Sequence, residues 1–364
     1  MGKLERLKEL EEELRKTKYN KRTEHAIGLL KAKIARLKHE LYEGGKSGRK
    51  TDGFSVKKTG DATVVLVGFP SVGKSTLLNK LTNAKSKVGF YEFTTLNCIP
   101  GMLNYKNAKI QLVDIPGLII GASSGIGHGK KVLSIVRNSD LILIIVDANK
   151  TQQIELIKNE LKNSGIIINK KKPDIRIKKK AYGGISIAST VKLERINEDI
   201  IKSILKEFKI MNADVLIREE IDVDDFIDAV YGNRVYIPAL FVINKIDVMS
   251  KEDLKKLQES YADENTVFIS AELETNLELL KSKIFEKLEL MRIFLKKQGK
   301  KPDFDEPLIL KNNSTVKDLC AKIHKEFVKR FRFARVWGSS KFPGQKVGIN
   351  YKLKDKDIVQ IYLD

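Results

Sequence analysis

The feature that most constrains this chain is a glycine-bounded loop at residues 68–76, Gly-Phe-Pro-Ser-Val-Gly-Lys-Ser-Thr. It fits the phosphate-binding pattern G-x-x-x-x-G-K-[ST]. The β-branched run at 62–67 predicts a buried strand before the loop, and Leu77, Leu78 and Leu81 predict a helix after it. A strand, a glycine loop and a helix N-terminus together form an anion site, because backbone N–H groups and the helix dipole face the phosphates.

The side chains of this loop have separate expected roles. Lys74 should reach the β- and γ-phosphates, and Ser75 should place its hydroxyl on Mg²⁺. We expect the loop to contact the nucleotide through Gly68, Pro70, Ser71, Val72, Gly73, Lys74, Ser75 and Thr76.

A second motif predicts the base. The apolar strand that precedes Asn244, Lys245 and Asp247 ends in Asn-Lys-x-Asp. The Asp247 carboxylate can accept both the N1–H and the N2 amino hydrogens of guanine, a donor pair that adenine lacks. Asn244 should tie this loop to the phosphate loop, and the Lys245 stem should cover the base. Ser270 and Ala271 follow another short strand, and the Ala271 N–H should meet guanine O6.

Further elements lie between these two motifs. Asp114 ends a strand and begins Asp-Ile-Pro-Gly, so it should hold Mg²⁺ through water while the Gly117 N–H senses the γ-phosphate. Thr94 and Thr95 are candidates for the magnesium-binding threonine, and Thr95 is favoured. The expected catalytic residues are Lys74, Thr95 and Gly117, and the expected metal-binding residues are Ser75, Thr95 and Asp114. Together the motifs predict a GTPase.

The residue after Gly117 predicts slow hydrolysis. Other GTPases orient the attacking water there with a glutamine, and this chain has Leu118. Another residue, an ion or a partner must therefore complete hydrolysis. The glycine-rich segment 121–129 is the expected mobile switch, and its His128 has no orienting partner in the sequence that would make it a general base.

Composition predicts a cytoplasmic protein that faces a polyanion. The formal net charge is +21, and 42% of the residues are hydrophobic, which suffices for real cores. Such an excess of positive charge predicts attraction to RNA, although a solvated lysine-rich surface is the alternative. Cys98 and Cys320 form no metal motif or disulfide framework. No signal peptide or membrane-spanning run is visible.

The spacing of the motifs divides the chain. We expect an N-terminal helical hairpin and basic linker at 1–50, and a GTPase domain at 61–169 and 235–290. About 90 residues separate the strand ending at Asp147 from the guanine-binding strand, too many for one helix and a short loop. Residues 170–234 are therefore an insertion, with a very basic, strand-like opening at 170–180 and a helical remainder at 190–234.

Several basic segments have two interpretations. The hairpin, with leucine and isoleucine stripes, is either a packing element or an RNA contact, and the linker is either a spacer or an RNA-binding arm. The acidic patch in the insertion has no partner histidines, so a capped, solvated helix is favoured over a metal site. Its carboxylates are Asp222, Asp224, Asp225 and Asp228.

The tail at 291–364 predicts a separate β-grasp domain. A hairpin of 292–295 with 307–310 precedes a helix capped by Thr315 and Asp318, which should run to Arg330. Strands at 331–337, 348–351 and 357–362 should complete the sheet. The basic and aromatic run 324–332 either packs against the core or binds RNA, and its candidate contacts are Lys325, Lys329, Arg330 and Arg332.

These motifs resemble those of the developmentally regulated GTP-binding proteins, a branch of the Obg-related GTPases. The resemblance covers nearly the whole chain and rests on the phosphate loop through Leu78, Tyr-Glu-Phe-Thr-Thr-Leu at 91–96 and Gly-Gly-Ile-Ser at 183–186, together with 232–234 and 336–339. The family usually has a glutamate where this chain has Ile120. Related GTPases that use potassium carry an asparagine at the position of Ser71, so K⁺ stimulation is left open.

The resemblance implies an α/β protein. Its parts are a P-loop GTPase core with a doubly wound, mostly parallel sheet, an inserted small α/β subdomain, an N-terminal helical hairpin and a C-terminal ubiquitin-like TGS domain. It also implies a slow GTP hydrolase that uses Mg²⁺, acts as a switch on ribosomes or their RNA, and has a regulatory protein partner. The alternatives are a nucleotide-gated RNA- or ribosome-binding scaffold and a ribosome-assembly factor. Neither membrane binding nor DNA sequence specificity is expected.

Overall fold

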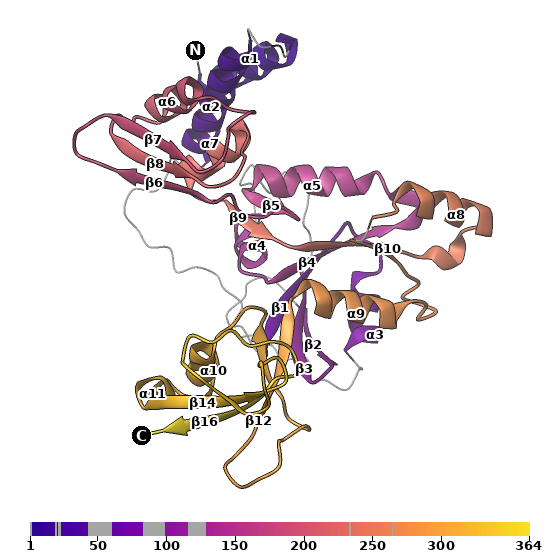
Figure 1. The fold of residues 1–364 in the computed structure, drawn as a ribbon. Coiled ribbons are helices and arrows are strands. Elements are labelled where there is room, and N and C mark those ends of the chain that lie inside the picture. The colour runs from indigo at the N-terminus through magenta and orange to yellow at the C-terminus, as the bar shows by residue number, and fades with distance from the viewer. Residues whose placement is uncertain are drawn as a thin grey trace. The chain divides into compact units, whose positions relative to one another are not determined.

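The computed structural model describes residues 2–18, 20, 23–42, 60–82, 99–115, 129–232, 234–263 and 265–364. The chain divides into two compact units, whose elements are drawn in Figure 1. One unit comprises Met1–Gly53, Gly121–Lys130 and Glu160–Tyr236, and the other comprises Phe54–Ile120, Lys131–Asn159 and Ile237–Asp364. In the described part of the chain, no helix combines the length and the apolar character needed to cross a membrane.

The second unit contains a six-stranded sheet in the order β11-β10-β4-β1-β3-β2. Neighbouring strands are parallel except β2 and β3, which are antiparallel. β1 and β10 are buried along their whole length, as expected where both faces of a parallel sheet are covered. The strands are β1 (Ala62–Val67), β2 (Ile99–Tyr105), β3 (Ala108–Asp114), β4 (Leu141–Asp147), β10 (Ala239–Asn244) and β11 (Thr266–Phe268).

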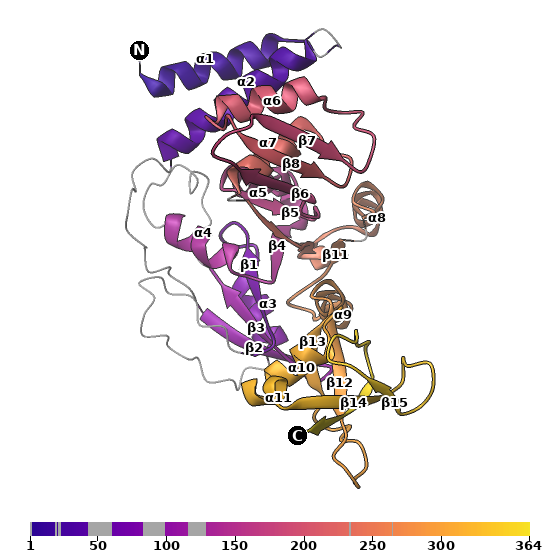
Figure 2. The same cartoon turned by 60° about the vertical axis from the view of Figure 1, so that its left-hand side comes forward.

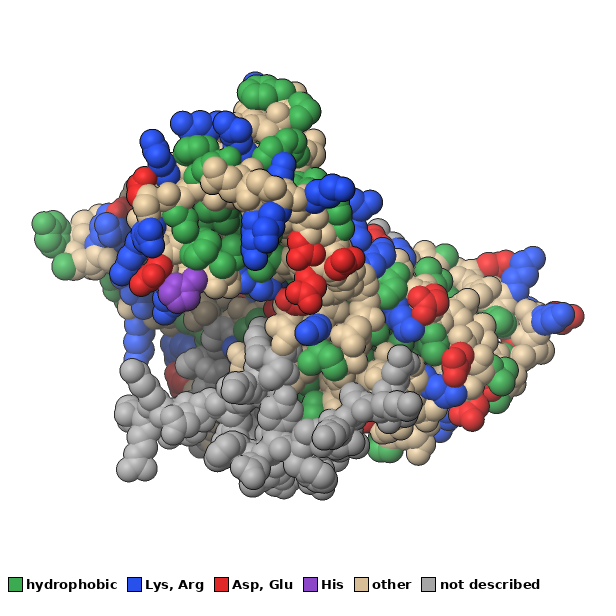
Figure 3. All heavy atoms as spheres, turned by 90° about the horizontal axis from the view of Figure 1, so that it is seen from below, with side chains coloured by type: hydrophobic (Ala, Val, Ile, Leu, Met, Phe, Trp, Pro, Cys, Tyr) green, Lys and Arg blue, Asp and Glu red, His purple; other side chains and the backbone are tan. Residues whose placement is uncertain are grey.

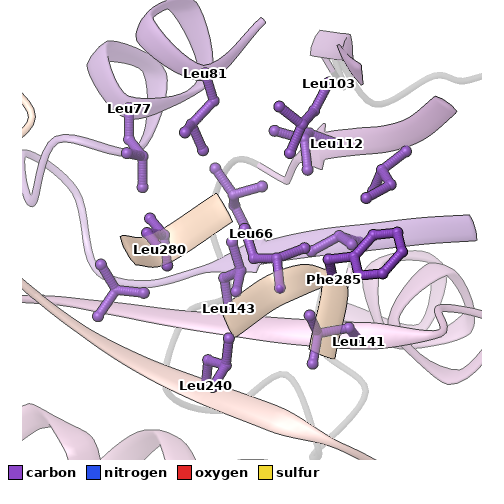
Figure 4. Packing of buried hydrophobic residues seen from close by; sticks show 14 of the residues in the cluster. Leu66, Leu77, Leu81, Leu103, Leu112, Leu141, Leu143, Leu240, Leu280 and Phe285 are labelled. Atoms are coloured by element: carbon purple, nitrogen blue, oxygen red, sulfur yellow. The ribbon is translucent and has the colours of Figure 1, made fainter. Parts of the chain in front are cut away.

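Apolar side chains from helices and strands form the core of this sheet. Figure 4 shows Leu77 of α3 and Leu280 of α9 near Leu66 of β1 and Leu143 of β4. Because these strands are parallel, their carboxyl ends lie at one edge of the sheet, where loops can bring functional groups together. The helices are α3 (Lys74–Leu81), α4 (Gly129–Arg137), α5 (Gln153–Asn163), α8 (Lys251–Ser260) and α9 (Leu277–Lys287), with 3₁₀ turns at Ala148–Lys150 and Ile246–Val248.

The first unit joins the N-terminal helices to the insertion. Helices α1 (Lys3–Lys16) and α2 (Glu24–Tyr42) form a hairpin, and Ala32 of α2 is fully buried in the core of the insertion. The Lys31 and Arg36 side chains pair with Asp224 and Glu207 at 2.8 Å in each case. The hairpin is therefore a packing element of the insertion.

The insertion is a small α/β subdomain built on a three-stranded sheet in the order β6-β8-β7. The prediction of a helical remainder was wrong in part, because strand β8 lies between the two helices. Its residues Ala213, Val215 and Ile217 are buried and alternate with more exposed ones, the period of a strand. The elements of the subdomain are β6 (Ile175–Lys179), β7 (Ile185–Ser189), α6 (Glu198–Glu207), β8 (Ala213–Ile217) and α7 (Val223–Tyr231). At its two ends, β5 (Ile166–Ile168) and β9 (Val235–Ile237) form a separate two-stranded sheet.

The acidic patch of the insertion caps and pairs a helix. The predicted cap is present, because Asp222 and Asp225 form a capping box at the start of α7. The prediction that these carboxylates are solvated was wrong for Asp225, which is buried. Asp225 also pairs with Lys170, and Asp228 pairs with Arg234 at 2.7 Å. Burial raises the pKa of the Asp228 carboxyl, and Arg234 opposes that shift. Among the described residues, no group of three or more histidine, cysteine, aspartate or glutamate side chains could hold a metal ion.

The C-terminal domain is a five-stranded sheet in the order β13-β12-β16-β14-β15, with α10 on one face (Figure 2). The predicted hairpin and the Thr315–Asp318 capping box are confirmed. Two predictions were wrong: extended backbone at His324 separates two helices, and the short edge strand lies at 345–347 instead of 348–351. The elements are β12 (Leu290–Leu295), β13 (Leu308–Lys311), α10 (Val316–Ile323), α11 (Lys325–Lys329), β14 (Phe331–Trp337), β15 (Gln345–Val347) and β16 (Ile358–Leu363).

This domain is attached to the six-stranded sheet of the same unit. Ile309 of β13 is buried in the core shown in Figure 4. Lys311 pairs with Asp140 at 2.8 Å, and Lys322 of α10 pairs with Asp61 at 2.9 Å. The β12–β13 end of the C-terminal sheet therefore belongs to the contact with the six-stranded sheet.

Candidate functional site

The phosphate loop connects β1 to α3, and two of its glycines are sterically required. A Cβ at Gly68 would lie 2.3 Å from the Ile145 carbonyl oxygen of the neighbouring strand. Gly73 has φ 92°, and a Cβ there would lie 2.4 Å from Asn244 Nδ2. Ser71 also has a positive φ, of 61°. The loop is thus held close to the neighbouring backbone and to the loop after β10.

Lys74 is buried at the start of α3 and folds back over the loop. Its ammonium donates to the carbonyl oxygens of Gly68 at 3.0 Å and Phe69 at 2.9 Å. Burial lowers the pKa of Lys74, and the Asp114 carboxylate opposes that shift. A phosphate group in the loop would compensate this buried charge better than the carbonyls do.

Ser75 and Asp114 lie side by side as a set of oxygen ligands. The Ser75 hydroxyl donates to Asp114 Oδ2 at 2.8 Å. Asp114 is 6% exposed, and its Oδ1 atom is buried with no hydrogen-bond partner among the described residues. A hydroxyl next to an unsatisfied carboxylate oxygen is the donor set that Mg²⁺ prefers. These residues therefore fit a magnesium ion.

Asn244 joins the two loops that the sequence assigned to phosphate and base. Its Nδ2 donates to the Val72 carbonyl oxygen at 2.9 Å, which confirms the predicted tie to the phosphate loop. Its Oδ1 accepts from the Ala271 N–H, also at 2.9 Å. Asn244 is 2% exposed, so both hydrogen bonds are shielded from water. The N–H that we expected on guanine O6 is here engaged by Asn244.

The other residues of the base loop lie around this amide. Asp247 lies in a 3₁₀ turn, and its side chain is exposed. Ser270 is fully buried, and its hydroxyl accepts from the Leu273 N–H at 3.1 Å. Asp247 therefore presents a carboxylate to solvent, while Ser270 shapes the adjacent turn.

Sequence reasoning missed Asp147. It ends β4 directly opposite Asn244 in the parallel register, and its carboxylate pairs with Lys245 at 2.9 Å. Burial raises the pKa of Asp147, but hydrogen bonds from Asn149 and Lys245 leave it below its usual value. The signal was available, because an apolar strand that ends in aspartate places a carboxylate at the same sheet edge as Asn244.

Part of the predicted site lies outside the described residues: Thr94, Thr95, Gly117, Leu118, Ile120 and His128. Within the described part of the chain, the structure gathers the predicted groups at the carboxyl ends of β1, β3, β4 and β10. The phosphate-loop, Asp114 and Asn244 elements belong to one compact unit.

The fold and these contacts define a P-loop GTPase, a protein that binds GTP and hydrolyses it. Family models agree: one described as a 50S ribosome-binding GTPase matches residues 63–179, one for the C-terminal region of the MMR_HSR1 domain matches 182–290, and one for the TGS domain matches 291–363. The chain belongs to the developmentally regulated GTP-binding protein family, and its sequence resemblance to that family is confirmed.

Relatives match along the whole chain. Human developmentally-regulated GTP-binding protein 2 is 45% identical, and the match covers 99% of each chain. The Dictyostelium discoideum homologue is 48% identical with the same coverage. An uncharacterised GTP-binding protein of Methanocaldococcus jannaschii is 54% identical over 100% of this chain and 93% of its own length.

Solved structures show weaker likeness. A GTP-binding protein of Pyrococcus horikoshii matches with a TM-score of 0.44 and 17% identity, over 83% of this chain and 100% of that one. The YchF GTPase of Schizosaccharomyces pombe matches with a TM-score of 0.45 and 15% identity, over 84% and 99%.

Proposed function

We propose that this GTPase is a slow, magnesium-dependent switch whose GTP-bound form docks on ribosomes or their RNA. The observation that carries the proposal is the buried Asn244 amide, which bonds to the phosphate loop on one side and to the base loop on the other. Ligand binding at either loop would therefore affect the position of the other loop through Asn244. A net charge of +21 and the ribosome-binding description of the matching family model support the choice of partner.

The chain's own groups account for nucleotide binding. Lys74 would exchange its two carbonyl partners for β- and γ-phosphate oxygens, a charge-assisted contact. Ser75 and Asp114 would hold Mg²⁺, which neutralises charge on the phosphates when it is bound. Asp247 would accept the two donors of the guanine edge.

Hydrolysis requires a water oxygen to bond to the γ-phosphorus while the bond to the β–γ bridging oxygen breaks, releasing GDP and phosphate. Leu118 has no polar atom to orient that water. Turnover by the isolated protein should be on the order of 10⁻⁴–10⁻² s⁻¹. A ribosome, a protein partner or K⁺ should raise it.

The base contact is tested by Asp247→Asn. An amide cannot accept both guanine donors, so GTP affinity should fall about 10- to 100-fold, the value of one or two charge-assisted bonds. Xanthosine triphosphate, which carries an oxygen in place of the amino group, should bind the variant better than GTP does. Calorimetry with GTP, ATP and xanthosine triphosphate measures this. Equal affinity of the wild type for ATP and GTP would overturn the assignment of the base.

The switch is tested by sedimentation of the full chain with ribosomes in the presence of GDP or a non-hydrolysable GTP analogue. We expect more protein in the ribosome pellet with the analogue, and less at higher salt, because each phosphate contact releases counterions. A scaffold with little turnover would sediment in the same way while ribosomes and K⁺ leave its GTPase rate unchanged. An assembly factor would sediment with precursor particles instead. Sedimentation that ignores both nucleotide and salt contradicts the proposal.

Deleting residues 291–364 is not a clean test of docking. Ile309 of the C-terminal domain is buried in the core of the six-stranded sheet, and Lys311 and Lys322 pair with Asp140 and Asp61. Deletion would expose that core and disturb the GTPase domain. Point variants on the far side of the C-terminal sheet avoid this problem.

A further inference from the structure

One face of the C-terminal sheet divides into a covered part and an open part. Arg292 of β12 lies directly opposite Ile309 of β13, so the two share a face, and Ile309 is buried in the GTPase core. The opposite face packs on α10 through Ala334, Val336 and Val359. The remaining positions of β14, β15 and β16 point away from α10, on the face that carries Ile309.

Aromatic rings gather on this open part. Phe333 of β14 and Tyr362 of β16 are cross-strand partners, and their rings stack with centroids 4.3 Å apart and planes 16° from parallel. Trp337 lies four residues further along β14, and a Cβ on Gly344 would lie 3.1 Å from its Nε1 atom. All three side chains are half-buried, so each ring is supported by the sheet and still reaches solvent.

Cations cover the rings. Lys346 Nζ lies 4.4 Å from the centroid of Phe333, Lys296 Nζ lies 4.6 Å from that of Trp337, and the Arg335 guanidinium lies 5.8 Å from that of Tyr362. The described positions of β14, β15 and β16 that face away from α10 carry no aspartate or glutamate; they are Phe333, Arg335, Trp337, Lys346, Ile358, Gln360 and Tyr362. Among them Gln360 is buried, at 6% exposure. Figure 3 shows lysine and arginine side chains interspersed with apolar ones, and smaller groups of acidic side chains, on the surface that it draws.

We propose that this aromatic face, formed by Phe333, Tyr362, Trp337, Arg335, Lys346 and Lys296, binds an unpaired RNA segment by base stacking. The proposal rests on the proposed ribosome docking and names the part of the ribosome that this domain contacts. Rings with cations beside them are the combination that binds single strands: bases stack on the rings, and cations track the phosphates.

The cations can change partners when RNA arrives. A cation–π contact at an exposed site is weaker than the stacking of a base on an aromatic ring. Lysine and arginine side chains are long and flexible, so their heads can leave the rings for phosphates while bases take their place. The face thus differs from the run at 324–332 that sequence suggested, whose Phe327 and Phe331 pack against the core.

The single tryptophan of the chain makes the proposal measurable. A fluorescein-labelled 12-nucleotide oligouridine RNA is titrated at several salt concentrations into the full-length protein loaded with a non-hydrolysable GTP analogue. We expect Trp337 fluorescence to be quenched with the same midpoint as the rise in anisotropy. A double-stranded RNA of equal length should bind more weakly and leave Trp337 unquenched.

Matched variants separate stacking from general charge. Phe333→Leu with Tyr362→Leu keeps apolar cover but removes two rings, and affinity should fall at least 10-fold. Arg335→Gln with Lys346→Gln should lower the slope of log affinity against log salt by about one to two. Lys325→Gln with Lys329→Gln removes equal charge from α11 and should change little. Circular dichroism and GTP affinity check that each variant is folded.

The outcomes are separable from those of the proposed function. If the wild type sediments with ribosomes but oligouridine does not quench Trp337, or if the two charge-removal pairs have equal effects, this inference is wrong and ribosome docking stands. If the leucine variant loses ribosome binding without any RNA-dependent quenching, the occupant is a ribosomal protein and the inference is again wrong. If the wild type never sediments with ribosomes, the proposed function fails whatever the RNA titration gives.

Discussion

The nucleotide site and the aromatic face of the C-terminal sheet bring functional groups together in opposite ways. At the nucleotide site the groups come from short motifs, and buried hydrogen bonds fix them: Asn244 is 2% exposed and bonds to two loops. On the aromatic face, the groups come from strands far apart in sequence and are half-exposed. One site is fixed before its ligand arrives, and the other must exchange cation–π contacts for ligand contacts. A variant that disables one site should therefore leave the other site working.

The largest effect is expected from Lys74→Ala. This variant removes the buried ammonium that now bonds to the Gly68 and Phe69 carbonyl oxygens. GTP affinity should fall about 100-fold, because charge-assisted bonds to the phosphates are lost. Calorimetry with GTP measures the loss. Binding of oligouridine, followed through Trp337, should stay within about twofold if the two sites are independent.

Lys80→Ala is the matched control for this prediction. Lys80 lies on the same helix, but its side chain is exposed and pairs with Glu274 at 2.8 Å. Exposed ion pairs contribute little, so both affinities should hardly change. Equal loss of GTP affinity in the two variants would mean that the effect comes from the helix and not from the phosphate contact.

The same contrast explains what sequence could and could not predict. Sequence predicted the phosphate loop, Asp114 and the Asn244 motif. Phosphate binding, magnesium binding and base recognition each require particular residue types at short, fixed spacing. The fold class was predicted because these motifs carry the resemblance to a known GTPase family, and that resemblance implies the fold. Asp147 was missed because its partner Lys245 is nearly 100 residues away and only the parallel register brings them together. The aromatic face was missed for the same reason, since Phe333 and Tyr362 meet only through strand pairing.

The prediction of secondary structure was wrong where the local sequence pattern was weakest. Strand β8 is five residues long and lies between two helices, so its alternation was hidden by helical neighbours. The break between α10 and α11 at His324 was missed because the apolar spacing of Leu319, Ile323 and Phe327 continues across it. At strand β8 and at His324, the packing of side chains determines the secondary structure, and sequence periodicity does not.

A smaller effect is expected from Gly73→Ala, which tests the rigidity of the nucleotide site. The φ of 92° strains any other residue, and the new Cβ would displace the Asn244 amide from 2.4 Å. Loss of the bridge between the loops should weaken GTP binding about 10-fold, by roughly 1–2 kcal/mol of strain and lost hydrogen bonding. Nucleotide competition assays measure this.

Gly348→Ala provides the control in the other region. A Cβ at Gly348 would meet nothing within 4 Å, and its backbone is not in the left-handed region. Neither GTP affinity nor RNA binding should change by more than about twofold. If Gly73→Ala is equally silent, the phosphate loop adapts more readily than its contacts indicate, and the contrast between the two regions weakens.

The smallest effect is expected from Asp318→Asn, which tests the stability of the sheet that carries the aromatic face. Asp318 accepts from the Thr315 N–H at 2.7 Å and hydroxyl at 2.8 Å, and these bonds hold the pKa of its carboxyl below the usual value. A depressed pKa means that the stabilisation is complete above the unfolded value near pH 4 and is lost as the pH falls through the folded value.

At pH 7 the Asp318→Asn variant should lose roughly 0.5–1 kcal/mol of unfolding free energy, as for other helix caps. At the lowest pH at which the domain stays folded, the difference from wild type should be smaller, because a larger fraction of the Asp318 carboxyl is then protonated. Urea unfolding followed by Trp337 fluorescence reports on this domain, and Asp305→Asn, in an exposed loop, serves as the control. A penalty that is equal at both pH values would assign the effect to lost geometry and not to the charge of Asp318.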